Sequence, residues 1–238
     1  MLKPLLSEFL ASFLISFMMA FARINNHNDY FIIGLTYFML IGCLTYSFKK
    51  ISGSHFNPIL TFSLLITKQI SSKKAVLYIF VQVLGSIIGG ILVYSAHQIL
   101  NEGETVYYGE PRLTESERYT GAFTELISMF VLVYVYNGII GNVKAPKHIY
   151  GAAIASVYLF SVISFGFVSG GCVNLVSLFG PSIFSGHFID WFPYLVSQLL
   201  GGVVSGTFYT LFLSKNATDD DDEEETEMIN NADKEKAY

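Results

Sequence analysis

Six long segments that consist almost wholly of apolar residues constrain the fold of this chain more than any other feature of its sequence. They are residues 4–22, 30–48, 75–99, 120–143, 149–168 and 191–213. Each is close to or above the length of about 20 residues that a helix needs to cross the hydrocarbon core of a bilayer. Charged residues make up only 14% of the chain. The sequence therefore predicts an all-α membrane protein and argues against a soluble enzyme or a disordered chain.

Two acidic residues, Glu8 and Glu125, are the only charged residues inside these six segments. An ionisable group in a spanning helix is costly and normally faces the bundle interior or a water-filled cavity. Glu8 also argues against a cleaved signal peptide, although Lys3 and the small residues around Phe21 would suit one. We therefore expect the first segment to remain in the protein as a spanning helix.

Two shorter uncharged runs, at residues 57–67 and 173–186, lie between the long segments. A helix rises about 1.5 Å per residue, so runs of this length cover only about half of a 30 Å hydrocarbon core. Irregular backbone at that depth is tolerated only where it is buried in protein or lines a water-filled cavity. We therefore expect two re-entrant half-helices.

The chain contains an internal repeat with an offset of 117 residues, which places Glu8 on Glu125 and Asn57 on Asn174. Each half holds three spanning segments and one half-helix. Because three is odd, the second half must enter the membrane upside down relative to the first, and inverted repeats of this kind place a binding site near the midplane. The two repeats cover about residues 4–99 and 120–213.

Asn57 and Asn174 stand at the start of the two half-helices. Asn57 suits a helix cap, and Pro58 suits the first helical position because it has no N–H to satisfy. Inversion brings both Asn side chains to the same depth, where their amides can donate hydrogen bonds to a neutral polar solute. Two positive helix N-termini at this point repel cations. Helix capping alone would explain either Asn by itself, but it does not explain the repeated context.

The first Asn lies in Ser52-Gly53-x-His55-x-Asn57-Pro58, and the second lies in Gly170-Gly171-Cys172-Val173-Asn174, followed by Phe179-Gly180-Pro181. These motifs resemble the two signatures of the aquaporin and aquaglyceroporin (major intrinsic protein) family, the second in a degraded form. The resemblance covers about residues 4–213 and implies six spanning helices and two half-helices around a passive channel that assembles as a homotetramer. It also implies that Glu8 and Glu125 support the loops and that His55 lines the inner pore, unless His55 only binds loop backbone.

By the same resemblance, the outer selectivity filter consists of Tyr37, Val162, Gly171 and Ser177. Ser177 stands where the family has an arginine, so a fixed positive charge with several donors is replaced by a short neutral side chain. No Lys or Arg lies between Lys147 and Lys215, so no sequence neighbour replaces the missing charge. We expect a constriction wider and less polar than a strict water filter, which would admit water and small neutral solutes such as glycerol or urea.

The charges outside the segments are unevenly distributed. With a cytoplasmic N-terminus, eleven lysines lie inside, whereas Arg23, Arg112 and Arg118 lie outside, which favours two cytoplasmic termini. Ten of the 19 acidic residues fall in residues 216–238. We expect this like-charged tail to be solvated and disordered, and to follow a channel domain of residues 1–215. Either the plasma membrane or an internal membrane is compatible with this pattern.

These observations together predict a passive channel in the lipid bilayer for water or small neutral solutes, and not an enzyme. Two alternatives stay open. One is an alternating-access transporter built on the same repeat, and the other is a non-conducting relative with a structural or adhesive role, which the degraded second motif suggests. The sequence shows no nucleophile–base pair, metal-ligand spacing or nucleotide-binding loop, so we expect no cofactor, no metal and no nucleic-acid partner.

Overall fold

The computed structural model describes residues 1–27, 29–100, 107–140, 145–146 and 148–213. The acidic tail at residues 216–238, for which disorder is predicted, lies outside the described residues. In chain order the elements are α1 (Leu2–Asn25), α2 (Tyr30–Ser52), α3 (Pro58–Ile66), α4 (Ser72–Leu100), η1 (Glu115–Glu117), α5 (Arg118–Ile140), α6 (Tyr150–Ser169), α7 (Val176–Ser185) and α8 (Trp191–Phe212).

Six of these helices, α1, α2, α4, α5, α6 and α8, are long and apolar enough to cross a membrane. The other two, α3 with 9 residues and α7 with 10 residues, are half-helices. The predicted fold class, an all-α membrane protein with six spanning helices and two half-helices, is therefore confirmed.

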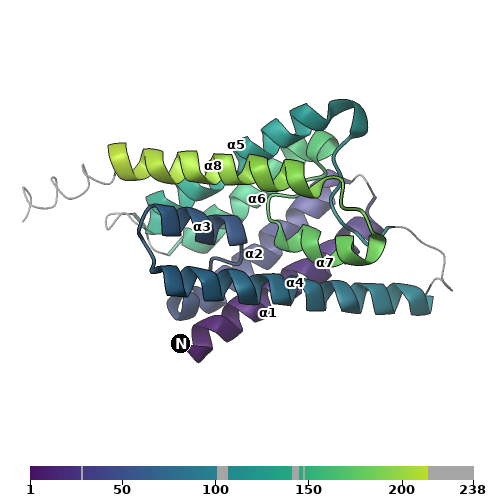
Figure 1. Ribbon diagram of the computed structural model, residues 1–238, viewed down its shortest axis with the longest axis horizontal. Helices are drawn as coiled ribbons and strands as arrows, with labels where there is room; N and C mark the ends of the chain where they lie inside the picture. Colours follow the sequence, from purple (N-terminus) through teal and green to yellow (C-terminus); the bar gives the residue numbers. More distant parts are fainter. Residues whose placement is uncertain (28, 101–106, 141–144, 147, 214–238) are drawn as a thin grey trace, which may run out of the picture.

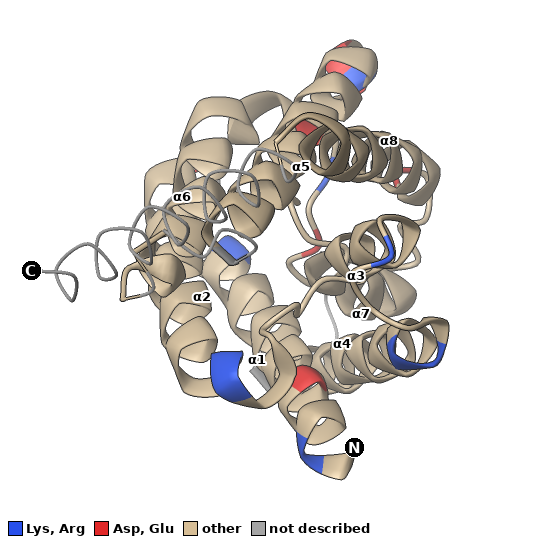
Figure 2. Cartoon of the chain, turned by 90° about the vertical axis from the view of Figure 1, so that its left-hand side faces the viewer, with Lys and Arg blue, Asp and Glu red and all other residues tan. Residues whose placement is uncertain are grey.

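The packing of the helices follows the internal repeat (Figure 1). In the first half α1 packs on α4 and α2, and in the second half α5 packs on α8 and α6. The two halves meet where α2 packs on α6, and each half-helix reaches across to the other half, α3 to α8 and α7 to α4. Figure 2 looks along the bundle and shows α3 and α7 between α4 and α8.

Glycines permit the closest approaches between helices. A Cβ atom on Gly85 of α4 would lie 2.5 Å from the carbonyl oxygen of Phe9 in α1, and one on Gly201 of α8 would lie 2.1 Å from that of Leu126 in α5. Any larger residue would push these helices apart, so the equivalent helix pairs of the two halves are held together by equivalent small residues.

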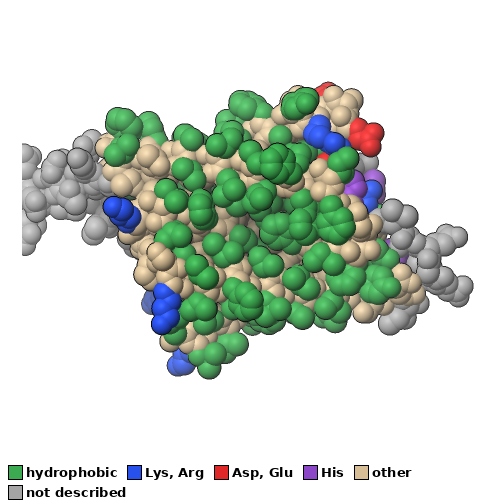
Figure 3. Space-filling model, viewed as in Figure 1, with side chains coloured by type: hydrophobic (Ala, Val, Ile, Leu, Met, Phe, Trp, Pro, Cys, Tyr) green, Lys and Arg blue, Asp and Glu red, His purple; other side chains and the backbone are tan. Residues whose placement is uncertain are grey.

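The surface of the bundle is mostly apolar between two polar ends (Figure 3). Leu2 of α1 and Phe212 of α8 lie at the same end, which we call the N-terminal end, and lysines gather there. The opposite end, called the far end, carries the acidic, basic and histidine side chains visible at the right of Figure 3. An apolar band between charged rims is what a bilayer requires of a protein that spans it.

Two details differ from the sequence-based expectation. Residue 23 was expected in an outer connection, but α1 continues to Asn25 and Arg23 is buried in its last turn, with 2% of its surface exposed. The second half-helix was expected to open at Asn174, but α7 begins at Val176 and Leu175 is its N-cap. Asn57 directly precedes the first residue of α3, whereas one residue separates Asn174 from the first residue of α7.

Candidate functional site

The first half-helix is fixed at its start by Asn57. Gly53, in the left-handed conformation at φ 99°, ends α2, and the chain then returns toward the bundle centre to begin α3 at Pro58. The Asn57 Oδ1 atom accepts hydrogen bonds from the backbone N–H groups of Ile59 at 2.9 Å and Leu60 at 3.4 Å. Asn57 is therefore a helix cap. Because both bonds use Oδ1, the Nδ2 group can donate to another acceptor.

Asn174 is held in the same manner, because its Oδ1 atom accepts from the backbone N–H of Val176 at 3.1 Å. The two Asn side chains then bind each other's loops. Asn57 Nδ2 donates to the carbonyl oxygen of Val173 at 3.2 Å, and Asn174 Nδ2 donates to that of Phe56 at 2.9 Å. Both side chains are completely buried, so the two half-helices meet end to end at the centre of the bundle.

The two carbonyl groups that accept these bonds belong to residues with unusual backbone. Phe56 has φ 48° and Val173 has φ 51°, a left-handed conformation that costs on the order of 1–3 kcal/mol for a residue with a side chain. Each is held in place by a buried glutamate. Glu8 accepts from Phe56 N at 2.7 Å, and Glu125 accepts from Val173 N at 2.8 Å.

The same carboxyl groups take two more donors each. Glu8 also accepts from the backbone N–H of His55 at 3.1 Å and from Gln82 Nε2 at 2.8 Å. In the second half, the corresponding donors to Glu125 are Cys172 N at 3.0 Å and Gln198 Nε2 at 2.8 Å. The two glutamates therefore contact the loops, and they hold the strained residues that aim a carbonyl group at the opposite Asn.

Four residues named from the sequence come together at one point between this centre and the far end. The Tyr37 hydroxyl donates to Ser177 Oγ at 2.8 Å and lies 3.0 Å from the Cys172 carbonyl oxygen. A Cβ atom on Gly171 would lie 3.0 Å from a methyl group of Val162, so these two residues are in contact as well. All four are buried. They form what we call the Tyr37 cluster: Tyr37, Val162, Gly171 and Ser177.

Arg23 completes the Tyr37 cluster from α1. Its Nη2 atom donates to the carbonyl oxygen of Gly171 at 2.8 Å and to the Tyr37 hydroxyl at 3.4 Å. Its guanidinium carbon lies 5.6 Å from the centre of the Tyr37 ring. The cluster therefore holds a buried positive charge, although Ser177 is neutral.

Tyr158 of α6 lies between the Tyr37 cluster and the two Asn residues. Its ring stacks on that of Tyr37 with centroids 5.2 Å apart, and its hydroxyl lies against the side chains of both Asn57 and Asn174. A phenol oxygen has two lone pairs and can accept from both amide groups. Tyr158 stands one helical turn before Val162 on the same face of α6, as a spacing of four residues requires.

His55 lies on the other side of the Asn pair, toward the N-terminal end. Its Nδ1 atom is 3.1 Å from the Thr61 hydroxyl, and its ring packs edge-on against those of Tyr78 and Tyr136. The partner of its side chain is therefore a hydroxyl group of α3. The alternative expectation, that the side chain only binds loop backbone, does not describe this contact.

A cavity of about 320 Å³ lies at the far end next to the Tyr37 cluster, and Arg23, Tyr30, Tyr107 and Arg112 are among the residues that line it. Burial raises the pKa of Tyr107 to about 12, with Arg23 acting in the opposite direction. Tyr107 is therefore a neutral phenol at physiological pH, and it adds hydrogen-bonding capacity to the wall without negative charge.

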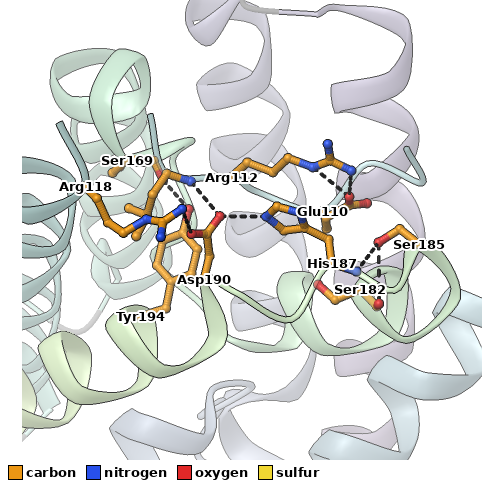
Figure 4. A network of polar contacts seen from close by, with 10 residues as sticks. Glu110, Arg112, Arg118, Ser169, Ser182, Ser185, His187, Asp190 and Tyr194 are labelled. Atoms are coloured by element: carbon orange, nitrogen blue, oxygen red, sulfur yellow. Dashed lines mark hydrogen bonds and ion pairs between the residues drawn. The ribbon is translucent and has the colours of Figure 1, made fainter. Parts of the chain in front are cut away.

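The rim of this cavity is held by two carboxyl groups (Figure 4). Glu110 binds Arg112, and Asp190 binds Arg118 at 3.4 Å and His187 at 2.8 Å. Asp190 also accepts from the backbone N–H of Leu113 at 3.1 Å. These contacts fix the described part of the loop before α5 to the start of α8, so the cavity has a defined wall.

A model of one protein family, described as major intrinsic protein, matches residues 1–209. The chain belongs to the major intrinsic protein family. The fold agrees with that of the aquaglyceroporin from Plasmodium falciparum, a solved structure with a TM-score of 0.78 that covers 91% of this chain and 98% of its own, at 23% sequence identity.

Several relatives of this major intrinsic protein are similar in sequence. Aquaporin NIP3-1 of Oryza sativa is 30% identical over 67% of this chain and 50% of its own, and mouse aquaporin-4 is 30% identical over 76% and 56%. Glycerol uptake facilitator protein-like 6 of Lactiplantibacillus plantarum is 28% identical over 76% of this chain and 83% of its own. The aligned part of the chain thus spans about half the length of the first two relatives.

Sequence comparison within the chain finds the Asn pair of this major intrinsic protein but misses Arg23 and Tyr158. Arg23 lies 148 positions before Gly171, and Arg23 has no counterpart in the repeat that would single it out. Tyr158 lies in α6, a helix without charged residues, and it is one of several aromatic residues in that helix. The spacing of four residues between Tyr158 and Val162 is the one sequence signal that could have found it.

Proposed function

We propose that this protein is a passive membrane channel for water and small neutral solutes such as glycerol or urea. The observation that carries the proposal is the reciprocal bonding of Asn57 and Asn174, each of which accepts from a backbone N–H in the first turn of its own half-helix and donates to the opposite loop. This arrangement points the N-termini of two helices at one buried spot that is also supplied with amide donors.

That spot favours a neutral polar solute over an ion. After the two cross-bonds, each Asn amide keeps one N–H that can donate to a hydroxyl, a urea carbonyl or a water molecule. The positive ends of α3 and α7 disfavour cations, protons included, at the same place. A solute that passes here exchanges hydration for fixed donors without a conformational cycle.

The roles of the other candidate residues depend on where they lie relative to the Asn pair. The Tyr37 cluster (Tyr37, Val162, Gly171, Ser177) forms the selectivity filter on the far side of the Asn pair. His55 lines the inner pore, while Glu8, Glu125 and Pro58 provide structural support. The small side chains of Gly171 and Ser177 favour a filter that admits glycerol or urea as well as water.

We further propose the arrangement of the chain in its membrane. Residues 1–215 form the channel domain, with repeats at about 4–99 and 120–213, and residues 216–238 form an acidic tail. Both termini face the cytoplasm, which is supported by the lysines at the N-terminal end and the arginines at the far end. Four copies assemble as a homotetramer, as the family resemblance implies.

A second candidate, a non-conducting relative with a structural role, is favoured by one observation. The Tyr158 side chain lies against both Asn side chains, where its hydroxyl can accept from the donors proposed for the solute. A protein whose centre stays closed in this way would span the membrane without conducting.

Stopped-flow light scattering of proteoliposomes that contain the full chain distinguishes these functions. We expect fast shrinkage in a sorbitol gradient and measurable uptake of glycerol or urea, with no saturation. Asn174→Ala should lower the flux, whereas Asn137→Ala should not, since Asn137 is a buried asparagine whose Oδ1 accepts from Gln69 and which does not contact the pair. Shrinkage no faster than that of empty vesicles, without solute uptake, would support the non-conducting alternative, and saturable uptake coupled to an ion gradient would support a transporter.

A further inference from the structure

Three arginines occupy the far end of the bundle, and they differ in what neutralises them. Arg112 is paired with Glu110, and Arg118 is paired with Asp190. Arg23 has no carboxylate within ion-pair distance among the described residues, although it is the most buried of the three, with 2% of its surface exposed. Burial of a charge without a counter-ion lowers the stability of the fold. The presence of such a charge therefore points to a role in function.

Part of the Arg23 guanidinium also lacks hydrogen-bond partners. Nη2 donates to Gly171 O and to the Tyr37 hydroxyl, whereas Nε and Nη1 have no acceptor in the part of the chain that the structure describes. Buried donors of a charged group are costly to leave unpaired. The same side chain lines the cavity of about 320 Å³ at the far end, so these buried donors belong to a side chain that lies between this cavity and the Tyr37 cluster.

The position of Arg23 can be compared with that of Ser177. Ser177 Oγ lies 2.8 Å from the Tyr37 hydroxyl, and Arg23 Nη2 lies 3.4 Å from the same oxygen atom. The two residues approach one hydroxyl from different helices, Ser177 from α7 and Arg23 from α1. A guanidinium group carried by α1 therefore reaches the place that a longer side chain at position 177 would reach from α7.

We propose that Arg23 is a specificity-determining residue of the channel, which supplies from α1 the fixed positive charge and hydrogen-bond donors of the outer filter. This proposal rests on the proposed channel function and deepens it. Arg23 binds the hydroxyl or carbonyl oxygen of a passing neutral solute, and it repels cations at the narrow point lined by Tyr37 and Gly171. The last turn of α1 suits this role, because a cation there is favoured by the negative end of the helix dipole.

The test compares selectivity and not only flux, since a merely structural role would lower all fluxes together. Proteoliposomes with the full chain are assayed for water permeability, glycerol permeability and sodium leak. Arg23→Ala should raise the glycerol-to-water ratio and the sodium leak by about tenfold, the factor expected for loss of a charged hydrogen-bonding group. Arg23→Gln keeps donors without the charge, so it should raise the sodium leak while changing the glycerol ratio less.

Two further variants sharpen the result. Lys50→Gln removes a positive charge from an exposed position in the last turn of α2, outside the Tyr37 cluster and the cavity wall, and should leave both ratios unchanged. Arg23→Ala combined with Ser177→Arg should restore low sodium leak, because both positions address the Tyr37 hydroxyl. If Arg23→Ala does not fold, Arg23→Gln provides the same test of charge.

The outcomes distinguish a failure of the channel function from a failure of the proposed role of Arg23. Absence of flux in the unaltered protein would overturn the channel function and this inference with it. Normal flux in the unaltered protein, with the glycerol ratio and sodium leak unchanged in both Arg23 variants, would overturn only the role of Arg23. A higher sodium leak in Arg23→Ala that the added Ser177→Arg substitution reverses would support the role of Arg23.

Discussion

Replacement of Tyr158 by phenylalanine tests how the centre of the bundle opens. The Tyr158 hydroxyl lies against the side chains of Asn57 and Asn174, where it can accept from both amide groups, so a solute must displace it before it can use the same donors. Each such bond contributes about 0.5–1.5 kcal/mol net, and two of them add about 1–3 kcal/mol to the barrier for passage. Because about 1.4 kcal/mol corresponds to a tenfold change in rate, Tyr158→Phe should raise water permeability by roughly 5- to 150-fold.

Tyr158→Val extends the test, because it removes the ring that stacks on Tyr37 as well as the hydroxyl. Its water permeability should be at least that of Tyr158→Phe, and its glycerol permeability should rise further, since the path between Tyr37 and the Asn pair becomes wider. Tyr194→Phe is the matched control: Tyr194 is completely buried and donates to the carbonyl oxygen of Ser169, and among the described residues it makes no hydrogen bond to either Asn.

Stopped-flow shrinkage of proteoliposomes, normalised to the amount of reconstituted protein, measures these changes. If Tyr158→Phe and Tyr158→Val both have the permeability of the unaltered protein, Tyr158 does not lie on the path of the solute. If Tyr194→Phe raises permeability as much as Tyr158→Phe, the effect comes from loosened packing, and the contact with the Asn pair is not its cause.

Two further predictions concern stability and can be checked by thermal unfolding in detergent. Glu125→Ala leaves the buried N–H groups of Cys172 and Val173 without their acceptor, so it should lower the free energy of unfolding by about 2–6 kcal/mol, whereas the exposed Glu117→Ala should have little effect. Gly180→Ala would place a Cβ atom 2.0 Å from the Ser86 carbonyl oxygen and should cost about 1–3 kcal/mol or more. Gly138→Ala, whose Cβ would meet nothing closer than 4.0 Å, should be neutral or stabilising. Equal melting temperatures within either pair would contradict the packing described here.

The sequence predicted the spanning helices and the half-helices because length and hydropathy decide both. A segment such as residues 149–168 has no alternative to a spanning helix, and α6 indeed runs from Tyr150 to Ser169. The approach of Asn57 to the loop before Asn174 followed from the repeat, since two equal halves inserted in opposite directions must bring equal positions to one depth. These inferences depended on periodicity and symmetry, which a sequence displays directly.

Arg23 escaped prediction because it depends on a contact that breaks the symmetry. In the repeat, the position 117 residues after Arg23 is Ile140, so the comparison of halves gives no reason to examine it. Its burial follows from α1 extending three residues beyond the apolar segment that ends at residue 22. The ends of helices are set by local capping and packing, and hydropathy locates them only to within a few residues.

The exchange of hydrogen bonds between the two loops has a consequence for biogenesis. The Asn57 amide binds Val173, which lies 116 residues later in the chain, and α3 packs on α8, which follows the other described helices in chain order. During synthesis, α3 therefore lacks these contacts until the second half of the chain has been inserted into the membrane. A defect confined to one half, such as loss of Glu125, should consequently leave the other half without its partner as well, and cellular quality control would encounter the protein as a single unit.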